Sequence, residues 1–252
     1  MKQTEKFIPF SKDVMFCEVM KHKDICKEII ERIIGRELKD VKYNNPQETL
    51  SASARARSIR LDVCVKTTDG TLIDVEMQVG HYNNLGLRFR GYQSIIDASY
   101  WKRGEDFNDL KETYIIFLCV DDPFDKQRPV YTFCPACKED RLTKEDFKLH
   151  WIALNAQAFD RASENVSDLL KYIRTNELSD DVLIHNIHNI VTEVNKDPEK
   201  VMKMTTVQDR YDEFQRIIDK KDEEIKRLRE RNAEEVAYLK KRLAQYESLN
   251  KF

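Results

Sequence analysis

The sequence lacks any apolar run of the length that a membrane-spanning helix requires. No stretch approaches the ~18 consecutive apolar residues that such a helix needs. The opening Met1-Lys2-Gln3-Thr4 does not start a signal peptide either. We therefore expect a cytoplasmic protein that has no membrane partner.

An excess of charge of one sign is also missing. The 43 Lys and Arg residues are balanced by 45 Asp and Glu residues, which gives a formal net charge of −2. Such a chain has no overall attraction to nucleic acid, so a nucleic-acid site must be a local basic patch. With 41% hydrophobic and 35% charged residues, the composition excludes a disordered chain and indicates one heavily charged segment.

The cysteines lack the spacing of a structural metal site. Four of the six lie in apolar or alternating segments, as buried free thiols do: Cys17, Cys26, Cys64 and Cys119. The other two form a single CxxC, Cys134 and Cys137, with only His150 near in sequence. A zinc site needs two such pairs or nearby histidines. We interpret the CxxC as part of a turn and keep a redox-active pair as the alternative.

What the sequence does contain is a β-hairpin in residues 60–78, with its turn at Asp69-Gly70. If residues 68–70 form the loop, Gly70 supplies the positive φ that the turn requires. One face of the hairpin then pairs apolar or small residues only: Thr67 with Thr71, Val65 with Ile73, Val63 with Val75, and Leu61 with Met77. Because register follows the hydrophobic pattern, we expect this pairing.

The opposite face of the predicted hairpin carries acids. The same register sets Asp62 against Glu76 and Cys64 against Asp74. Opposed like charges destabilise a sheet, and a hard divalent cation such as Mg²⁺ or Mn²⁺ is the usual agent that offsets them. For an arbitrary hairpin, the ordinary interpretation is a solvated strand face rich in acids.

An ordered set of motifs surrounds the hairpin within about residues 8–155. It consists of Lys12-Asp13-Val14-Met15-Phe16, Asn45-Pro46, Leu61-Asp62-Val63, Asp69-Gly70, Asp74-Val75-Glu76-Met77-Gln78, Arg88 and Tyr92. This set resembles the PD-(D/E)XK nuclease superfamily, in particular the transposase-associated branch that includes the Rpn, or recombination-promoting, nucleases. The resemblance favours a metal site over a solvated face.

The resemblance implies a metal-dependent DNA endonuclease associated with transposition or recombination. Asp62 and Glu76 would bind Mg²⁺ (or Mn²⁺), together with the Met77 carbonyl. Gln78 stands where many members have lysine, and a glutamine can form hydrogen bonds but cannot act as a base or a cation. We therefore expect the metal to activate the attacking water and Gln78 to orient it.

The same resemblance suggests which basic and acidic residues complete the site. Arg88 and Tyr92, four residues apart on a helix predicted at 84–101, would bind and orient the scissile phosphate; a structural Arg–Tyr stack is the alternative. Arg55 and Arg57 in the loop at 51–58, and Arg60 just after it, would lie beside the metal site and contact phosphate; the alternative is an ordinary soluble loop. An acid from the leading helices often completes the metal site, and the candidates, each otherwise part of a solvated helix face, are Glu18, Glu28 and Glu31.

The order of the predicted elements indicates an α/β fold. Besides the hairpin, we expect strands at residues 38–44, 113–120, 129–133 and 148–153, and helices in the leading segment and at 84–101. This order fits a sandwich around a mixed sheet, which the resemblance identifies as a restriction-endonuclease-like core flanked by helices over residues 8–158. A helical extension follows over residues 159–205.

The last segment, residues 206–252, is predicted to be one long charged helix. Thr206–Leu249 contains no Gly or Pro, and apolar residues recur in it at spacings of three and four, with Asn232 in the same seam. We interpret this seam as an imperfect coiled coil that joins two copies as a homodimer. A solvated single helix, or a helix folded back on the domain, is the alternative.

Two further functions are consistent with the sequence. A nuclease-like fold that cleaves weakly or not at all would act as a DNA-binding module. An interaction protein would act through its coiled-coil tail instead. The intact pair of Asp62 and Glu76 favours the endonuclease over both.

Overall fold

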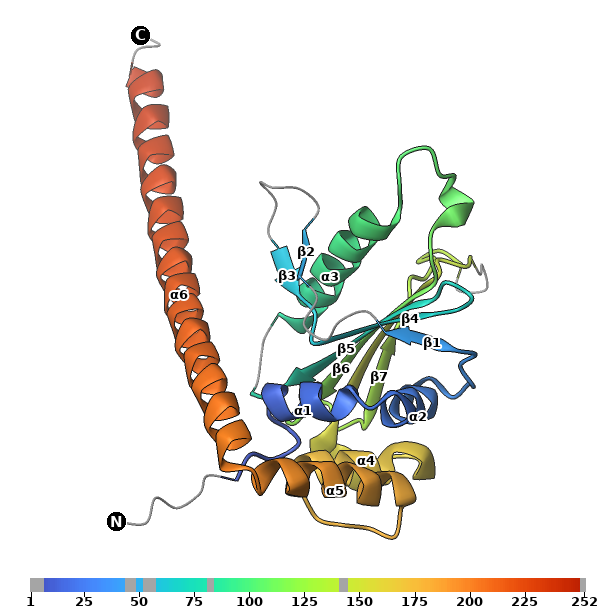
Figure 1. The fold of residues 1–252 in the computed structure, drawn as a ribbon. Helices are drawn as coiled ribbons and strands as arrows, with labels where there is room; N and C mark the ends of the chain where they lie inside the picture. Colours follow the sequence, from blue (N-terminus) through green and yellow to red (C-terminus); the bar gives the residue numbers. More distant parts are fainter. Residues whose placement is uncertain (1–6, 44–48, 52–57, 81–83, 141–144, 250–252) are drawn as a thin grey trace, which may run out of the picture. The chain divides into compact units, whose positions relative to one another are not determined.

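The computed structural model describes residues 7–43, 49–51, 58–80, 84–140 and 145–249 (Figure 1). The predicted turn at Asn45-Pro46 and the loop residues Arg55 and Arg57 lie outside these ranges. The chain divides into two compact units, Met1–Met204 and Thr205–Phe252.

A six-stranded mixed sheet forms the centre of the first unit. Its strands, in spatial order, are β1 (Val41–Tyr43), β4 (Val63–Thr67), β5 (Leu72–Gln78), β6 (Thr113–Cys119), β8 (Leu149–Asn155) and β7 (Val130–Phe133). β6 is parallel to β5 and to β8, and the other neighbours are antiparallel. Every residue of β6 is buried, as the continuous apolar run of this segment predicted for a central strand.

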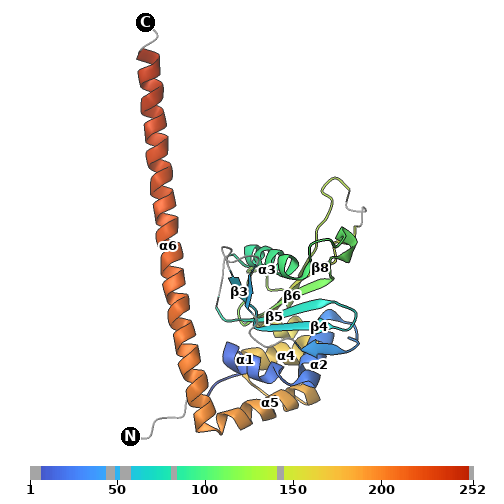
Figure 2. The same cartoon turned by 45° about the horizontal axis from the view of Figure 1, so that its top comes forward.

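Helices cover both faces of this sheet (Figures 1 and 2). One face lies against α1 (Asp13–Met20), α2 (Lys23–Ile34), α4 (Glu164–Thr175) and α5 (Val182–Asn195). The other face lies against α3 (Leu85–Tyr100). The predicted α/β fold, a mixed sheet flanked by helices, is thereby confirmed.

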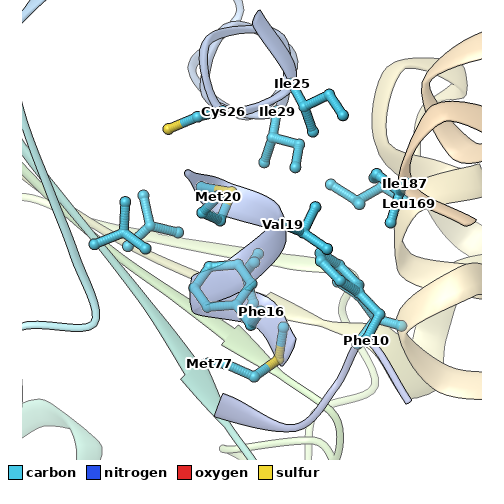
Figure 3. Packing of buried hydrophobic residues seen from close by; sticks show 14 of the residues in the cluster. Phe10, Phe16, Val19, Met20, Ile25, Cys26, Ile29, Met77, Leu169 and Ile187 are labelled. Atoms are coloured by element: carbon cyan, nitrogen blue, oxygen red, sulfur yellow. The ribbon is translucent and has the colours of Figure 1, made fainter. Parts of the chain in front are cut away.

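The larger core fills the space between the sheet and the four helices. Figure 3 shows Phe16 of α1 beside Met77 of β5, and Leu169 of α4 and Ile187 of α5 near Phe10. Phe10 and Phe16 are fully buried and their rings meet edge to face at 5.7 Å between centroids. The Met77 side chain therefore belongs to this core, on the face of β5 opposite to the acids.

The β4–β5 hairpin has the predicted register. Val63 pairs with Val75, Cys64 with Asp74, and Val65 with Ile73. The turn is closed by Gly70, whose φ is +92° and whose N–H donates to the Thr67 carbonyl at 3.1 Å. A glycine suits this position because L side chains rarely adopt a positive φ.

Two local expectations need correction. Residues on either side of the predicted loop at 51–58 form a small antiparallel sheet, β2 (Thr49–Ser51) with β3 (Ser58–Arg60). Asp62 was expected in a strand, but β4 begins at Val63, because the Asp62 N–H donates to a side chain, Glu76 Oε1.

The cysteines have the predicted surroundings. The four in apolar segments are buried, whereas Cys134 is exposed and Cys137 partly exposed in the segment that follows β7. Cys137 Sγ accepts the Asp140 N–H at 3.4 Å. Residues 134–137 have no regular secondary structure, and the interpretation of the CxxC as part of a turn stays a prediction.

The long helix is α6 (Pro198–Leu249), and it begins earlier than the expected residue 206. Pro198 occupies the first helical position, where a missing N–H costs nothing, and Asp197 Oδ1 accepts the Glu199 N–H at 3.0 Å. Val201 and Met204 pack on the core of the first unit. At 1.5 Å per residue, the helix is about 78 Å long. Across the described part of the chain, no helix has both the length and the apolar content needed to span a bilayer.

Candidate active site

Four polar side chains lie on the buried face of the hairpin that α3 covers. Asp74, Glu76 and Gln78 share this face because every second residue of a strand points the same way, and Asp62 precedes the neighbouring strand. Their exposed fractions are 0% for Asp74, 4% for Glu76, 7% for Gln78 and 8% for Asp62. The acidic face is therefore not the solvated strand face that an arbitrary hairpin would present.

The Glu76 carboxylate binds the backbone of Asp62, and the Asp62 carboxylate binds the backbone of Met77, the residue after Glu76. Glu76 Oε1 accepts the Asp62 N–H at 2.8 Å, and Asp62 Oδ2 accepts the Met77 N–H at 3.2 Å. Each carboxylate is thus held by a backbone N–H of the segment opposite its own. The arrangement fixes the two acids together, in spite of their like charge.

Two residues of α3 extend this arrangement. The Tyr92 hydroxyl donates to Glu76 Oε2 at 3.0 Å, and Arg88 Nη2 donates to the Tyr92 hydroxyl at 3.4 Å. The Arg88 guanidinium also lies 4.9 Å from the ring centre of Phe117. Burial, followed by the charge of Glu76, raises the pKa of Tyr92, so its hydroxyl remains a donor at neutral pH. The predicted pair on this helix therefore faces the acids.

Gln78 connects β5 to α3. Its Oε1 accepts a hydrogen bond from Arg88 Nη1, and its Nε2 donates to the Val79 carbonyl at 3.1 Å. Both ends of the amide are therefore engaged within the protein. Gln78 was predicted to orient the attacking water. In this structure its side chain binds Arg88 and so orients that guanidinium.

The three acids disfavour one another's charge. Burial raises the pKa of Asp62, Asp74 and Glu76 well above the ordinary values. The next largest cause is a neighbouring carboxylate: Glu76 acting on Asp62, Asp62 acting on Asp74, and Asp74 acting on Glu76. Arg88 lowers the pKa of Asp74 and Glu76, but it does not cancel the rise.

Asp74 is the residue that the sequence analysis left out of the site. Both of its carboxylate oxygens are buried and have no hydrogen-bond partner among the described residues. Such a group is costly to bury unless something pairs with it. The signal was present in the sequence, because Asp74 lies two residues before Glu76 and so shares its strand face.

The leading helix contributes an acid other than those expected. Asp13, the first residue of α1, is close enough that its charge raises the pKa of Asp62. The three predicted candidates instead bind basic neighbours on the helix surfaces: Glu18 with Lys21, Glu28 with Arg32, and Glu31 with Lys27. Helical spacing alone did not indicate which residue faces the hairpin.

The basic residues near the site come from two elements. Arg60, at the end of β3, is partly buried, and its charge lowers the pKa of Asp62. Arg88 faces the acids from α3. Arg57 lies outside the described ranges. Of the three arginines predicted to contact DNA beside the hairpin, the described residues include only Arg60, and the structure places it, together with Arg88, near the acidic face.

The chemistry of these side chains fits a hard divalent cation. Carboxylate oxygens are the ligands that Mg²⁺ and Mn²⁺ prefer, and the orphaned oxygens of Asp74 add to the negative charge that a cation would offset. Within the described ranges, however, no three His, Cys, Asp or Glu side chains are arranged as a complete metal site. A cation would therefore draw on two carboxylates with backbone or solvent oxygen.

Comparison with known proteins gives one match. The model of a family described as PD-(D/E)XK nuclease family transposase matches residues 10–252. No curated protein and no solved structure matches the chain. The matched range includes both the acidic face and α6.

Proposed function

The chain belongs to the PD-(D/E)XK nuclease family transposases, and from this membership we propose that it is a divalent-metal-dependent DNA endonuclease acting in transposition or recombination. One observation supports the proposal: Asp62 and Glu76, the two acids that the resemblance assigns to the motif, are buried together, and each carboxylate accepts a backbone N–H from the segment opposite. A buried acidic pair of this kind is costly without a function that requires it.

Asp62, Glu76 and the Met77 carbonyl are the groups that would hold Mg²⁺ or Mn²⁺. When bound, the cation polarises the phosphodiester and lowers the pKa of a water ligand. The protein's own contribution is to fix the carboxylates. The N–H groups of Asp62 and Met77 and the hydroxyl of Tyr92 hold them in place on a face that is almost fully buried.

Arg88 is the group that we propose meets the scissile phosphate. A guanidinium can bind two phosphate oxygens at once and offset the charge that develops on them. Gln78 and Tyr92 orient it through the hydrogen bonds described above. Arg60 and Arg57 would contact the DNA backbone beside the site and so supply the local basic patch that a chain with net charge −2 needs.

We propose that two copies act together. Cleavage of both DNA strands by an enzyme with one site per chain requires two chains, and twofold dimers are the commonest homo-oligomers. The exposed apolar residues of α6 are the surface through which the copies would join.

A DNA-binding module without cleavage is the second candidate. The observation that favours it is Gln78, because a glutamine replaces the lysine of many related nucleases and its amide is already engaged by Arg88.

Nicking of supercoiled plasmid tests the first proposal against the second. Wild-type protein should nick in Mg²⁺ or Mn²⁺ and not in EDTA, and Asp62→Asn should not nick under either condition. Asp97→Asn is the matched control, since Asp97 on α3 is a half-buried acid that accepts a hydrogen bond from Gln93 instead of joining the site. DNA binding without nicking by the wild type would favour the binding module, and equal nicking in EDTA would contradict the metal dependence.

A further inference from the structure

The outer part of α6 presents apolar side chains to solvent along one stripe. It consists of Ile225, Leu228, Val236, Leu239 and Leu243, and their exposed fractions range from 43% to 59%. We call these five residues the α6 stripe. Scattered exposed leucines are ordinary, but an aligned row of them marks an interaction surface.

The spacing keeps the α6 stripe straight. Ile225 and Leu243 are 18 residues apart, which is about five turns at 3.6 residues per turn, so they point in the same direction. The other three lie between them at steps of three and four, within about 80° of the helix circumference. A seven-residue repeat drifts around a helix in one direction and an eleven-residue repeat in the other. The α6 stripe contains one step of eleven residues, from Ile225 to Val236, and one of seven, from Val236 to Leu243. The two drifts cancel, so the stripe runs nearly parallel to the helix axis.

Charges on the two flanks of the α6 stripe are complementary in one orientation. Glu224 and Glu235 lie on one flank, and Arg229 and Lys240 lie on the other, each five residues after one of the glutamates. In a parallel pair of helices, a flank residue faces the residue five positions later on the opposite flank of the partner. Glu224 would then meet the partner's Arg229, and Glu235 the partner's Lys240.

An antiparallel pair satisfies these charges less well. Like flanks then face each other, which sets Arg229 near the partner's Lys240. The flank that carries Glu224 and Glu235 also carries Arg231 and Arg242. Because it contains both signs of charge, it does not oppose an antiparallel pair of helices. The basic flank therefore decides the orientation.

Asn232 gives a second, independent indication. It lies within the α6 stripe, between Leu228 and Val236, and it is exposed. In a parallel, in-register pair, Asn232 meets Asn232 of the partner, and the two amides can hydrogen-bond to each other. In an antiparallel pair centred on the stripe, Asn232 meets Val236, and a buried amide is left without a partner.

We infer that α6 pairs with α6 of a second copy as a parallel, in-register, two-stranded coil through the α6 stripe, with Asn232 against Asn232. The inference goes beyond nuclease chemistry and does not depend on it, since every group that carries it lies on α6.

Disulfide trapping in the full-length protein tests the orientation. The background carries Cys134→Ser and Cys137→Ser, which removes the two cysteines that are not buried. Ile225→Cys and Leu243→Cys are then made separately and oxidised, alone and as an equimolar mixture. Each variant alone should give a covalent dimer, and mixing should not increase the yield. Dimers formed only in the mixture would show antiparallel pairing and overturn the inference.

Light scattering on the same background tests whether the stripe pairs at all. Leu239→Asp should shift the protein from dimer toward monomer, and Lys241→Asp, which introduces the same residue on the opposite side of the helix, should not. A monomeric parent protein, or a dimer unaffected by Leu239→Asp, would overturn the inference. Plasmid nicking by these variants separates this outcome from failure of the proposed function, because metal-dependent nicking of one strand requires only the first unit.

Discussion

The acidic face of the hairpin and the α6 stripe depart from the ordinary distribution of side chains in opposite directions. The first buries three carboxylates, and the second exposes five apolar side chains. Folded chains usually do the reverse, because charge prefers water and apolar surface avoids it. Each departure is costly in the isolated chain and favourable once a partner is bound. Under the two proposals, the regions take partners of different kinds: a cation with DNA at the acidic face, and a second copy of the chain at the α6 stripe.

The largest expected effect comes from breaking the acidic pair. Asp62→Ala should reduce metal-dependent nicking to the level of a blank, because it removes one carboxylate and the acceptor of the Met77 N–H. The melting temperature and the oligomeric state should remain measurable and close to those of the wild type. Full nicking by Asp62→Ala would remove the acidic face from consideration.

The next effect comes from the opposite region. Leu228→Asp with Leu239→Asp should weaken dimer formation by at least ~10²-fold, because each buried leucine of a helical interface contributes roughly 2–5 kcal/mol. Sedimentation equilibrium on the full-length protein measures the change. Binding of Mn²⁺ should be unaffected, and a parallel loss of metal binding would show that the two regions are not independent.

A smaller effect is expected at Gln78. Gln78→Ala should lower the nicking rate roughly 10²-fold, the low end for a positioned catalytic group, because Arg88 loses an acceptor that orients it. Gln78→Lys should retain most of the rate, since lysine occupies this position in many related nucleases. Single-turnover kinetics at saturating Mg²⁺ measures both. An inactive Gln78→Lys would show that this pocket does not accept a second cation beside Arg88.

The pH dependence of stability sharpens the contrast between the regions. The ordinary pKa of a carboxyl group is about 4. Between that pH and a higher pKa in the folded chain, the folded state binds more protons than the unfolded state, so the free energy of unfolding falls as pH rises. Metal-free protein should therefore lose stability from about pH 4 upward, through the raised pKa values of Asp62, Asp74 and Glu76. Mn²⁺ should reduce the loss.

Asp74→Asn should make this pH dependence shallower, because it removes a buried carboxyl without changing its shape. Asp168→Asn, at a partly exposed acid of α4, is the control and should leave the slope unchanged. Urea unfolding between pH 5 and pH 8 gives the slopes. An unchanged slope in Asp74→Asn would show that Asp74 does not contribute to the fall in stability with rising pH.

The smallest effect is expected on the flanks of the α6 stripe. Glu235→Lys should weaken the dimer by roughly two- to fivefold, as expected for a solvent-exposed ion pair worth up to about 1 kcal/mol. Adding Lys240→Glu should restore the affinity in a parallel dimer, since the pair is then reversed. Failure of the second change to restore it would contradict the parallel register.

Elements that carry a local pattern of apolar residues could be predicted from the sequence. Alternation of apolar residues fixed the pairing of Val63 with Val75, and the apolar run of residues 113–120 indicated a central strand. The three-residue strands β2 and β3 carry too little alternation to be recognised. Periodicity in the sequence indicates which residues share a face of a helix, but not which end of the helix lies near the hairpin. That depends on packing, so the sequence pointed to three glutamates and not to Asp13, whose charge acts on Asp62.

Titration of Mn²⁺ into the metal-free, full-length protein, followed by calorimetry in two buffers of different ionisation enthalpy, tests the central claim most directly. Binding to the acidic face should be detected in the wild type, should release protons because the carboxyl groups have raised pKa values, and should be lost in Asp62→Asn and Glu76→Gln. Asp97→Asn should bind as the wild type does. No binding by the wild type, or equal binding by Asp62→Asn, would contradict the assignment of the buried acids as a metal site.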